Sequence, residues 1–305
     1  MSEFSATLIV DSGLSLAAPL LFASAGELIS ETAGVINIEL EGMMLTGAFA
    51  GVIAALYSHN VLMGFAAAAV AGMAVALLQG FLCFIFGVNQ VVAGIVLNIL
   101  VLGGTSYGID AILANSVNRS APTLHPLNIP GFSHLPFVGH VVFDQNIGVL
   151  IALVLVVVVW LFLRSAFGLP LKAVGESPAA ADALGVSVGV TRWLALVVCG
   201  ALAGIGGGQL ALGSLGVFTP DMTAGAGFIA LAAVIFGRWN AFGTAAAVLL
   251  FAVTEAFAIQ AQTLGIHVPY QLFASLPYLV TVLALALGGS GSLGPRGLGV
   301  NYEKA

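Results

Sequence analysis

The fold is decided by residues 42–109, GMMLTGAFAGVIAALYSHNVLMGFAAAAVAGMAVALLQGFLCFIFGVNQVVAGIVLNILVLGGTSYGI, which contain no Asp, Glu, Lys or Arg. A helix needs about 20 mostly apolar residues to cross the hydrocarbon core of a bilayer, so this stretch holds about two or three crossings. Residues 256–295 form a second run without these charges. The chain is therefore predicted to be a polytopic membrane protein.

The composition supports this prediction. The chain is 60% hydrophobic and only 7% charged, whereas soluble domains are about 25% charged. The apolar runs are continuous and do not alternate with a period of two, which favours helices over a transmembrane barrel. The net charge of −6 argues against a nucleic-acid partner, because phosphate binding needs clustered Lys and Arg. We expect an all-α bundle forming a single domain over residues 1–305.

About nine crossings, of about 20 residues each, fit the apolar runs. They are predicted at 14–30, 36–57, 61–86, 88–109, 146–164, 191–212, 224–237, 241–262 and 270–288. The seventh is short for a full crossing and is interpreted as a half-helix or as a helix that begins earlier. Two connections are long: 110–145, which is rich in proline, and 165–190.

The basic residues predict the orientation, because cytoplasmic loops carry most of the Lys and Arg. All but Arg119 of the seven basic residues fall on one side of this topology: Arg164, Lys172, Arg192, Arg238, Arg296 and Lys304. That side is predicted to be cytoplasmic, with 165–190 as a cytoplasmic loop and 110–145 as an extracytoplasmic one. The N-terminus then lies outside and the C-terminus inside, where Gly288 to Gly299 is predicted to be a flexible end.

The 165–190 loop contains a predicted short helix, Pro178 to Leu184. Ser177 is a natural N-cap, Pro178 suits the first helical position, and Gly185 can end the helix in a left-handed conformation. Such a short helix is not stable alone and must pack on something. Physics alone leaves two interpretations open: a docking surface for another protein, or an interfacial elbow between crossings.

Four segments carry a resemblance to a known family. Residues Gly175 to Gly185 resemble the cytoplasmic coupling helix of ABC importer permeases, with the pattern Gly-Glu-(Ser/Asn)-Pro-x-Ala-Ala-x-x-x-Gly. Residues 33–48, 89–100 and 227–237 resemble motifs of permeases in the branched-chain amino acid, ribose and nucleoside group. The segments occur in the expected order over nearly the whole chain. The chain thus resembles a multi-pass permease of the bacterial plasma membrane.

The resemblance implies a division of labour. This chain would hydrolyse no ATP, bind no cofactor and catalyse no reaction, and it has no Gly-x-x-x-x-Gly-Lys-(Ser/Thr) phosphate loop. A separate cytoplasmic ABC ATPase would use ATP and Mg²⁺, beside a second, different permease chain and an extracytoplasmic substrate-binding lipoprotein. The implied contacts with the ATPase are Gly175, Glu176, Ser177, Pro178, Ala180, Ala181 and Gly185.

The resemblance favours the nucleoside branch, and a simple sugar such as ribose or galactose is the alternative. The apolar runs hold no Lys or Arg, which agrees with a small neutral substrate. Polar residues within crossings are costly and mark candidate substrate paths. They are Asn37, Glu39, Glu41, Gln90, Asn98 and Glu255.

Most of these polar residues also have an interpretation in which they serve the structure and do not contact the substrate. Asn37, Glu39 and Glu41 could begin a broken helix that lines a cavity, or could lie in the interface. The preferred interpretation of Asn98 is that its side chain forms a hydrogen bond between two helices. Glu255 could be a protonated structural carboxyl. Glu27 and Glu31, near a helix end, are predicted to be solvated.

The remaining residues have simpler interpretations. Two Gly-xxx-Gly steps at Gly200, Gly204 and Gly208, and one at Gly47 and Gly51, predict close helix packing. Cys83 and Cys199 are predicted to be buried free thiols, and the five histidines are spaced for no metal site.

Other classes of protein predict different features. An ion-coupled secondary transporter could use Glu41 or Glu255 as its ion site, and would have internal inverted repeats, which are not evident. A membrane scaffold leaves the buried polar positions unexplained. Catalysis within the membrane has no matching motif.

Overall fold

The structure, a computed structural model, describes residues 2–113, 120–125, 145–263, 275, 279 and 294–302. Every regular element of more than one residue in these ranges is helical, which confirms the all-α prediction. The long helices are α1 (Ser2–Thr32), α2 (Leu40–Ser58), α3 (Val61–Gly80), α4 (Gln90–Leu113), α5 (Ile147–Arg164), α8 (Val188–Leu210) and α10 (Ala241–Thr263). The short helices are α6 (Gly168–Glu176), α7 (Pro178–Ala183) and α9 (Ala226–Phe236). One π-helical turn, Phe81–Ile85, extends α3 and another, Ala211–Leu215, extends α8.

Seven of these helices are long and apolar enough to cross a membrane, counted over the described residues. The predicted seventh crossing is α9, whose 11 residues make it a half-helix. The predicted ninth crossing, 270–288, lies outside the described residues. Gly34, with a left-handed conformation (φ +85°), ends α1. The second crossing begins at Leu40 rather than at residue 36, because the N–H groups of Ile36 and Asn37 bond to the Gln90 and Glu27 side chains in a turn.

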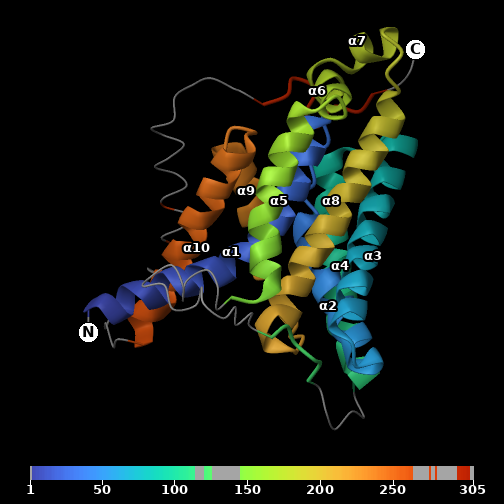
Figure 1. The fold of residues 1–305 in the computed structure, drawn as a ribbon. Coiled ribbons are helices and arrows are strands. Elements are labelled where there is room, and N and C mark those ends of the chain that lie inside the picture. The colour runs from blue at the N-terminus through green and yellow to red at the C-terminus, as the bar shows by residue number, and fades with distance from the viewer. Residues whose placement is uncertain are drawn as a thin grey trace.

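The long helices run side by side, and α6 and α7 lie together at one end of the bundle (Figure 1). We call this end the α6–α7 face. The described C-terminal residues lie at the same end, whereas the N-terminus lies far from it. Pro19 lies inside α1 and removes one helical hydrogen bond. The N-terminal part of α1 runs obliquely to the rest of the bundle.

Glycine steps bring the centre of the bundle into backbone contact, as predicted. A Cβ atom at Gly72 of α3 would collide with the Gly200 carbonyl oxygen of α8. One at Gly47 of α2 would collide with the Gly204 carbonyl oxygen. These close approaches hold α2 and α3 against α8 through van der Waals packing, and they fix the helices that carry the polar residues.

Candidate substrate pocket and coupling surface

The predicted short helix is present as α7, and it follows a helix that the sequence analysis missed. Ser177 occupies the N-cap position in an extended conformation, but its side chain makes no capping hydrogen bond. Gly185 takes the predicted left-handed conformation, with φ +85°. The missed helix is α6, which begins at Gly168 where the backbone comes close to Leu163 of α5.

α7 packs on the chain through one side and exposes the other. Ala181 is buried in a small apolar cluster with Val174 and Val188. Of the other residues assigned to ATPase contact, Glu176, Ser177, Ala180 and Gly185 are exposed, Pro178 is partly buried and Gly175 is buried. Leu184 is 84% exposed at the end of the helix. An apolar side chain that is this exposed suits a contact with another protein. The sequence analysis did not assign Leu184 to such a contact, although a leucine that ends an alanine-rich helix could have indicated it.

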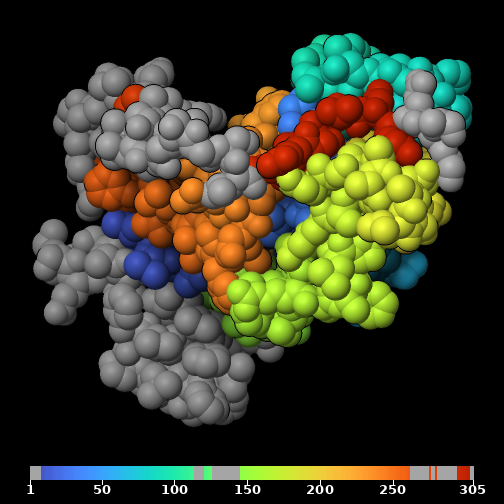
Figure 2. Space-filling model, turned by 90° about the horizontal axis from the view of Figure 1, so that it is seen from above, coloured from blue at the N-terminus to red at the C-terminus, as the bar shows by residue number. Residues whose placement is uncertain are grey.

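The C-terminal segment 294–302 is bonded to the α6–α7 face, so the predicted flexible end is wrong for residues 294–299. The Gly297 N–H donates to the Gly175 carbonyl (2.8 Å) and the Gly299 N–H to the Gly34 carbonyl (3.1 Å). Arg296 pairs with Glu176 at 2.9 Å. Figure 2 shows the segment in red, lying against the yellow-green atoms of α6 and α7. The flexible end was predicted because the segment is rich in glycine. In the structure, these glycines let the backbone of the segment come close enough to bond to the backbone of Gly34 and Gly175.

Further bonds join this segment to α8, to the turn before α4 and to α7. The buried Arg192 of α8 donates to the Val300 carbonyl at 2.7 Å. The Asn301 side chain donates to the Gly87 carbonyl (3.0 Å), just before α4, and the Tyr302 hydroxyl donates to Asp182 of α7 (3.2 Å). Residues 294–302 therefore act as a strap across the end of the bundle.

The turn between α1 and α2 carries a buried polar cluster. Asn37 donates through its backbone N–H (3.0 Å) and its amide (2.6 Å) to the Glu27 carboxyl group. Glu31 accepts a hydrogen bond from the Trp239 indole N–H. Glu27 and Glu31 are fully buried, so their predicted solvation is wrong. The turn folds back on the end of α1, and α8 and the turn after α9 cover the carboxyl groups.

Two more predicted path residues belong to this cluster. Gln90 accepts from the Ile36 N–H at 3.0 Å, and it is 1% exposed. Glu39 is completely buried, and neither of its carboxyl oxygens has a hydrogen-bond partner in the described part of the chain. The structure thus places Asn37, Glu39 and Gln90 inside the protein, where Asn37 and Gln90 fix the turn.

Glu41 has a different place, at the start of the half-helix α9. Its carboxylate accepts from the backbone N–H groups of Gly225 (2.9 Å) and Gly227 (2.7 Å), and from the Thr223 hydroxyl. The first N–H groups of a helix have no partner within the helix, and they favour a negative charge. Glu41 of α2 therefore supplies the cap that the α9 sequence lacks.

The backbone before α9 is irregular and strained. Asp221 (φ +58°) and Ala224 (φ +44°) both take left-handed conformations without being glycine. Such conformations cost about 1–3 kcal/mol each and persist where the surroundings enforce them, commonly at functional sites. This non-helical backbone lies before α9 and is separate from the turn at Asn37 and Glu39, where the sequence analysis considered a broken helix.

These elements surround a pocket of about 360 Å³. Its lining includes Glu41, Asn98, Asp221, Gly225 and Phe228. Asn98 also bridges α4 to α2, donating to the Ile38 carbonyl (2.9 Å) and accepting from the Gly42 N–H (2.8 Å). This confirms the predicted hydrogen bond between helices. Among the six predicted path residues, Glu41 and Asn98 alone line the pocket; Asp221 and Phe228 were missed, since an isolated Asp and Phe give no sequence signal.

The other predicted residues lie elsewhere. Glu255 is exposed on α10, outside this pocket. Cys83 and Cys199 are buried free thiols, as predicted. His59 and His125 are exposed, and the other three histidines lie outside the described residues. In the ranges that the structure covers, no group of three His, Cys, Asp or Glu side chains is arranged to hold a metal ion.

Known proteins are similar to this chain over most of its length. The family described as branched-chain amino acid transport system, permease component, matches residues 9–285. The permease protein TsgC13 of Haloferax volcanii, whose name gives a glucose ABC transporter, is 35% identical over 91% of this chain and 90% of its own.

Two relatives are named for nucleosides. The guanosine ABC transporter permease protein NupQ of Bacillus subtilis is 33% identical, and the nucleoside ABC transporter permease protein NupC of Lactococcus lactis is 32% identical. Each match covers 98% of this chain and 97% of the relative. A second permease from each of these three organisms also matches, at 25–30% identity over 64–68% of its length. With its bundle of apolar helices, this chain is a multi-pass protein of the cell membrane and belongs to the family of branched-chain amino acid transport system permease components.

Proposed function

We propose that this chain is the permease of an ATP-driven importer for nucleosides, and that the pocket between α2, α4 and α9 contacts the substrate. The observation that carries the proposal is the Glu41 carboxylate on the start of α9 beside an irregular backbone. In membrane proteins, half-helices and unwound backbone are tolerated where they line a cavity or a path. The pocket offers both polar groups and an aromatic ring, which suits a nucleoside.

Two side chains give this pocket its suitability for a neutral, hydroxylated ligand. Asp221 is exposed and can accept hydrogen bonds from ribose hydroxyl groups. Phe228 is 47% exposed and offers a ring face on which a base can stack. A simple sugar is the second candidate, because TsgC13 carries a glucose name. It would use Asp221 as a hydrogen-bond acceptor.

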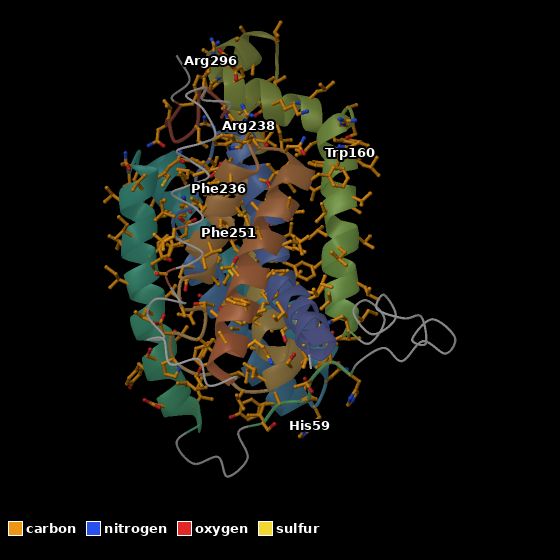
Figure 3. All side chains as sticks on the ribbon, turned by 90° about the vertical axis from the view of Figure 1, so that its left-hand side faces the viewer. His59, Trp160, Phe236, Arg238, Phe251 and Arg296 are labelled. Carbon is orange, nitrogen blue, oxygen red and sulfur yellow. The ribbon has the colours of Figure 1, made fainter. Side chains whose placement is uncertain are left out.

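The α6–α7 face is proposed to be cytoplasmic and to dock an ABC ATPase. Arg164, Lys172, Arg192, Arg238 and Arg296 all belong to elements at this end, and Figure 3 shows Arg238 and Arg296 there with His59 at the opposite end. This asymmetry is the pattern of cytoplasmic surfaces. Exposed Ala180 and Leu184 of α7 would contact the ATPase, which would hydrolyse ATP with Mg²⁺. The N-terminus and the 110–145 loop would then face outward, toward a substrate-binding lipoprotein.

The second permease is proposed to be a different chain. Three organisms each contain a nearly full-length match and a second permease that matches over about two thirds of its length. Within each organism the two names give the same substrate class. A pair of related but unequal permeases accounts for this repetition better than a homodimer does.

Uptake by the reconstituted complex tests the proposal. Proteoliposomes containing this chain, its second permease and the ATPase would be given labelled guanosine or labelled glucose with the loaded binding protein. We expect ATP-dependent uptake of guanosine, and a loss of guanosine uptake in Phe228→Ala. Uptake of glucose alone would support the sugar alternative. Uptake that follows an ion gradient without ATP would overturn the importer.

A further inference from the structure

A second pocket lies on the α6–α7 face, apart from the proposed substrate pocket. It has a volume of about 380 Å³ and is bounded by the ends of α5 and α6 and by the turn between α9 and α10. In Figure 2 it is the hollow between the orange atoms of α10 and the green atoms of α5 and α6, with blue atoms from the end of α1 at its floor. We call it the Trp160–Trp239 pocket after its two tryptophans.

The lining of this pocket is positively charged. Arg164 and Lys172 both line it, and in the described ranges neither forms an ion pair with a carboxylate. Arg164 lies over the Trp160 ring, 4.3 Å from its centroid, which limits the positions of the guanidinium group. The one acidic lining residue, Glu176, already pairs with Arg296. The pocket therefore favours an anion.

The side of the pocket opposite α5 and α6 is the turn between α9 and α10, and this turn is held in place by strain and by buried contacts. Arg238 (φ +55°) and Trp239 (φ +54°) both take left-handed conformations. The Trp239 indole N–H donates to the buried Glu31, and the Gly294 backbone lies against the indole ring. A strained turn that is pinned on two sides gives a preformed wall, so the hollow is part of the fold rather than a gap between mobile side chains.

The position of the pocket points to a ligand from the bilayer. α5 ends at Arg164 and α10 begins at Ala241, so the pocket lies where two spanning helices leave the membrane. Trp160 packs against Phe242 of α10, with ring centroids 5.5 Å apart, and Phe242 is 49% exposed. Tryptophans beside basic residues are typical of the membrane interface, and basic pockets between spanning helices bind lipid headgroups.

We propose that the Trp160–Trp239 pocket binds the headgroup of an anionic phospholipid from the leaflet at the α6–α7 face. The phosphate would lie between Arg164 and Lys172, and the acyl chains would follow the outer sides of α5 and α10 past Phe242. A free phosphate would bind the same two basic residues, but it has no acyl chains to contact the apolar surface of α5 and α10 beside Phe242. The lipid would join α5, α6 and the turn before α10 at the base of the proposed ATPase docking surface.

Lipid retention by the purified full chain tests the proposal. The chain would be titrated with phosphatidylglycerol and, separately, with phosphatidylcholine of the same acyl chains, and bound lipid would be counted by native mass spectrometry. In Arg164→Gln with Lys172→Gln, we expect the preference for phosphatidylglycerol to fall about 30-fold. The control is Leu184→Gln, which places the same new side chain on an exposed position of the same face outside the pocket lining and should retain the preference.

Each other outcome has a defined meaning. An equal preference in all three proteins overturns the proposal. Displacement of the lipid by millimolar inorganic phosphate identifies a soluble anion as the ligand and overturns the lipid source. In membranes that lack the ABC ATPase, a photo-crosslinker at Lys172 that captures only a protein identifies a protein interface and overturns the proposal too. If the double variant does not fold, Lys172→Gln alone, on the exposed side of α6, should lower the preference about fivefold.

Discussion

The cap that Glu41 provides for α9 gives the sharpest prediction. Glu41→Gln keeps the size of the side chain but replaces one acceptor oxygen with an NH₂ group. The native carboxylate accepts hydrogen bonds from two backbone N–H groups and one hydroxyl group. In the variant, the new NH₂ group, itself a donor, lies opposite at least one of these N–H groups. A buried donor left unpaired costs about 1–3 kcal/mol, which is about 5–150-fold in the population of the native arrangement.

We therefore expect Glu41→Gln to reduce substrate uptake by about tenfold or more, within the range set by one unpaired N–H. The assay is ATP-dependent uptake of labelled nucleoside by proteoliposomes, divided by the amount of folded chain from size-exclusion chromatography. The matched control is Glu255→Gln, because Glu255 is exposed on α10 outside the pocket. Its uptake should equal that of the wild type.

The result that refutes this reasoning is wild-type uptake per folded chain in Glu41→Gln. That outcome would mean that the start of α9 needs no carboxylate, and that the pocket does not depend on its position. A fall in the amount of folded chain with unchanged uptake per chain would refute the functional role as well, and would leave Glu41 as a packing residue.

Three further predictions follow from other parts of the structure. Ala180→Arg, on the exposed side of α7, should leave the chain folded but abolish the stimulation of the ATPase by the loaded binding protein; unchanged stimulation would remove α7 from the docking surface. A stop codon at Gly294 should lower the free energy of unfolding by about 1.5–3 kcal/mol, because the Arg192 guanidinium loses its hydrogen bond to the Val300 carbonyl, and adding Arg192→Met should restore part of the thermal stability in detergent. Gly72→Ala should cost about 1–3 kcal/mol or more, because the added Cβ collides with α8; the matched control Gly103→Ala, with nothing within 4 Å of its Cβ, should not lower the melting temperature in the same assay.

Local signals predicted the elements best. Continuous apolar runs located the long helices, because a spanning helix must satisfy its backbone within one segment of about 20 residues. Ser177, Pro178 and Gly185 located α7 in the same way, through the backbone conformations that they favour. α6 was missed because its start depends on a contact between Gly168 and the end of α5, which is not a local property.

Contacts distant in sequence explain the errors in the site. Glu27 and Glu41 look alike in the sequence, as acids near a helix end, yet Glu27 fixes the turn after α1 and Glu41 caps α9, almost 190 residues away. The C-terminal glycines looked flexible because their partners, Gly34 and Gly175, lie far upstream. A single sequence contains no signal for such pairings.

The strap also sets the order in which the protein can mature. The groups that receive residues 294–302 belong to α6, α7, α8 and the turns before α2 and α4, all of which are synthesised much earlier. The face that we propose for the ATPase is therefore complete only after residues 294–302 have left the ribosome. A chain that terminates before residue 294 would lack the carbonyl groups that Arg192 binds, so that only chains that include the strap present a finished docking surface.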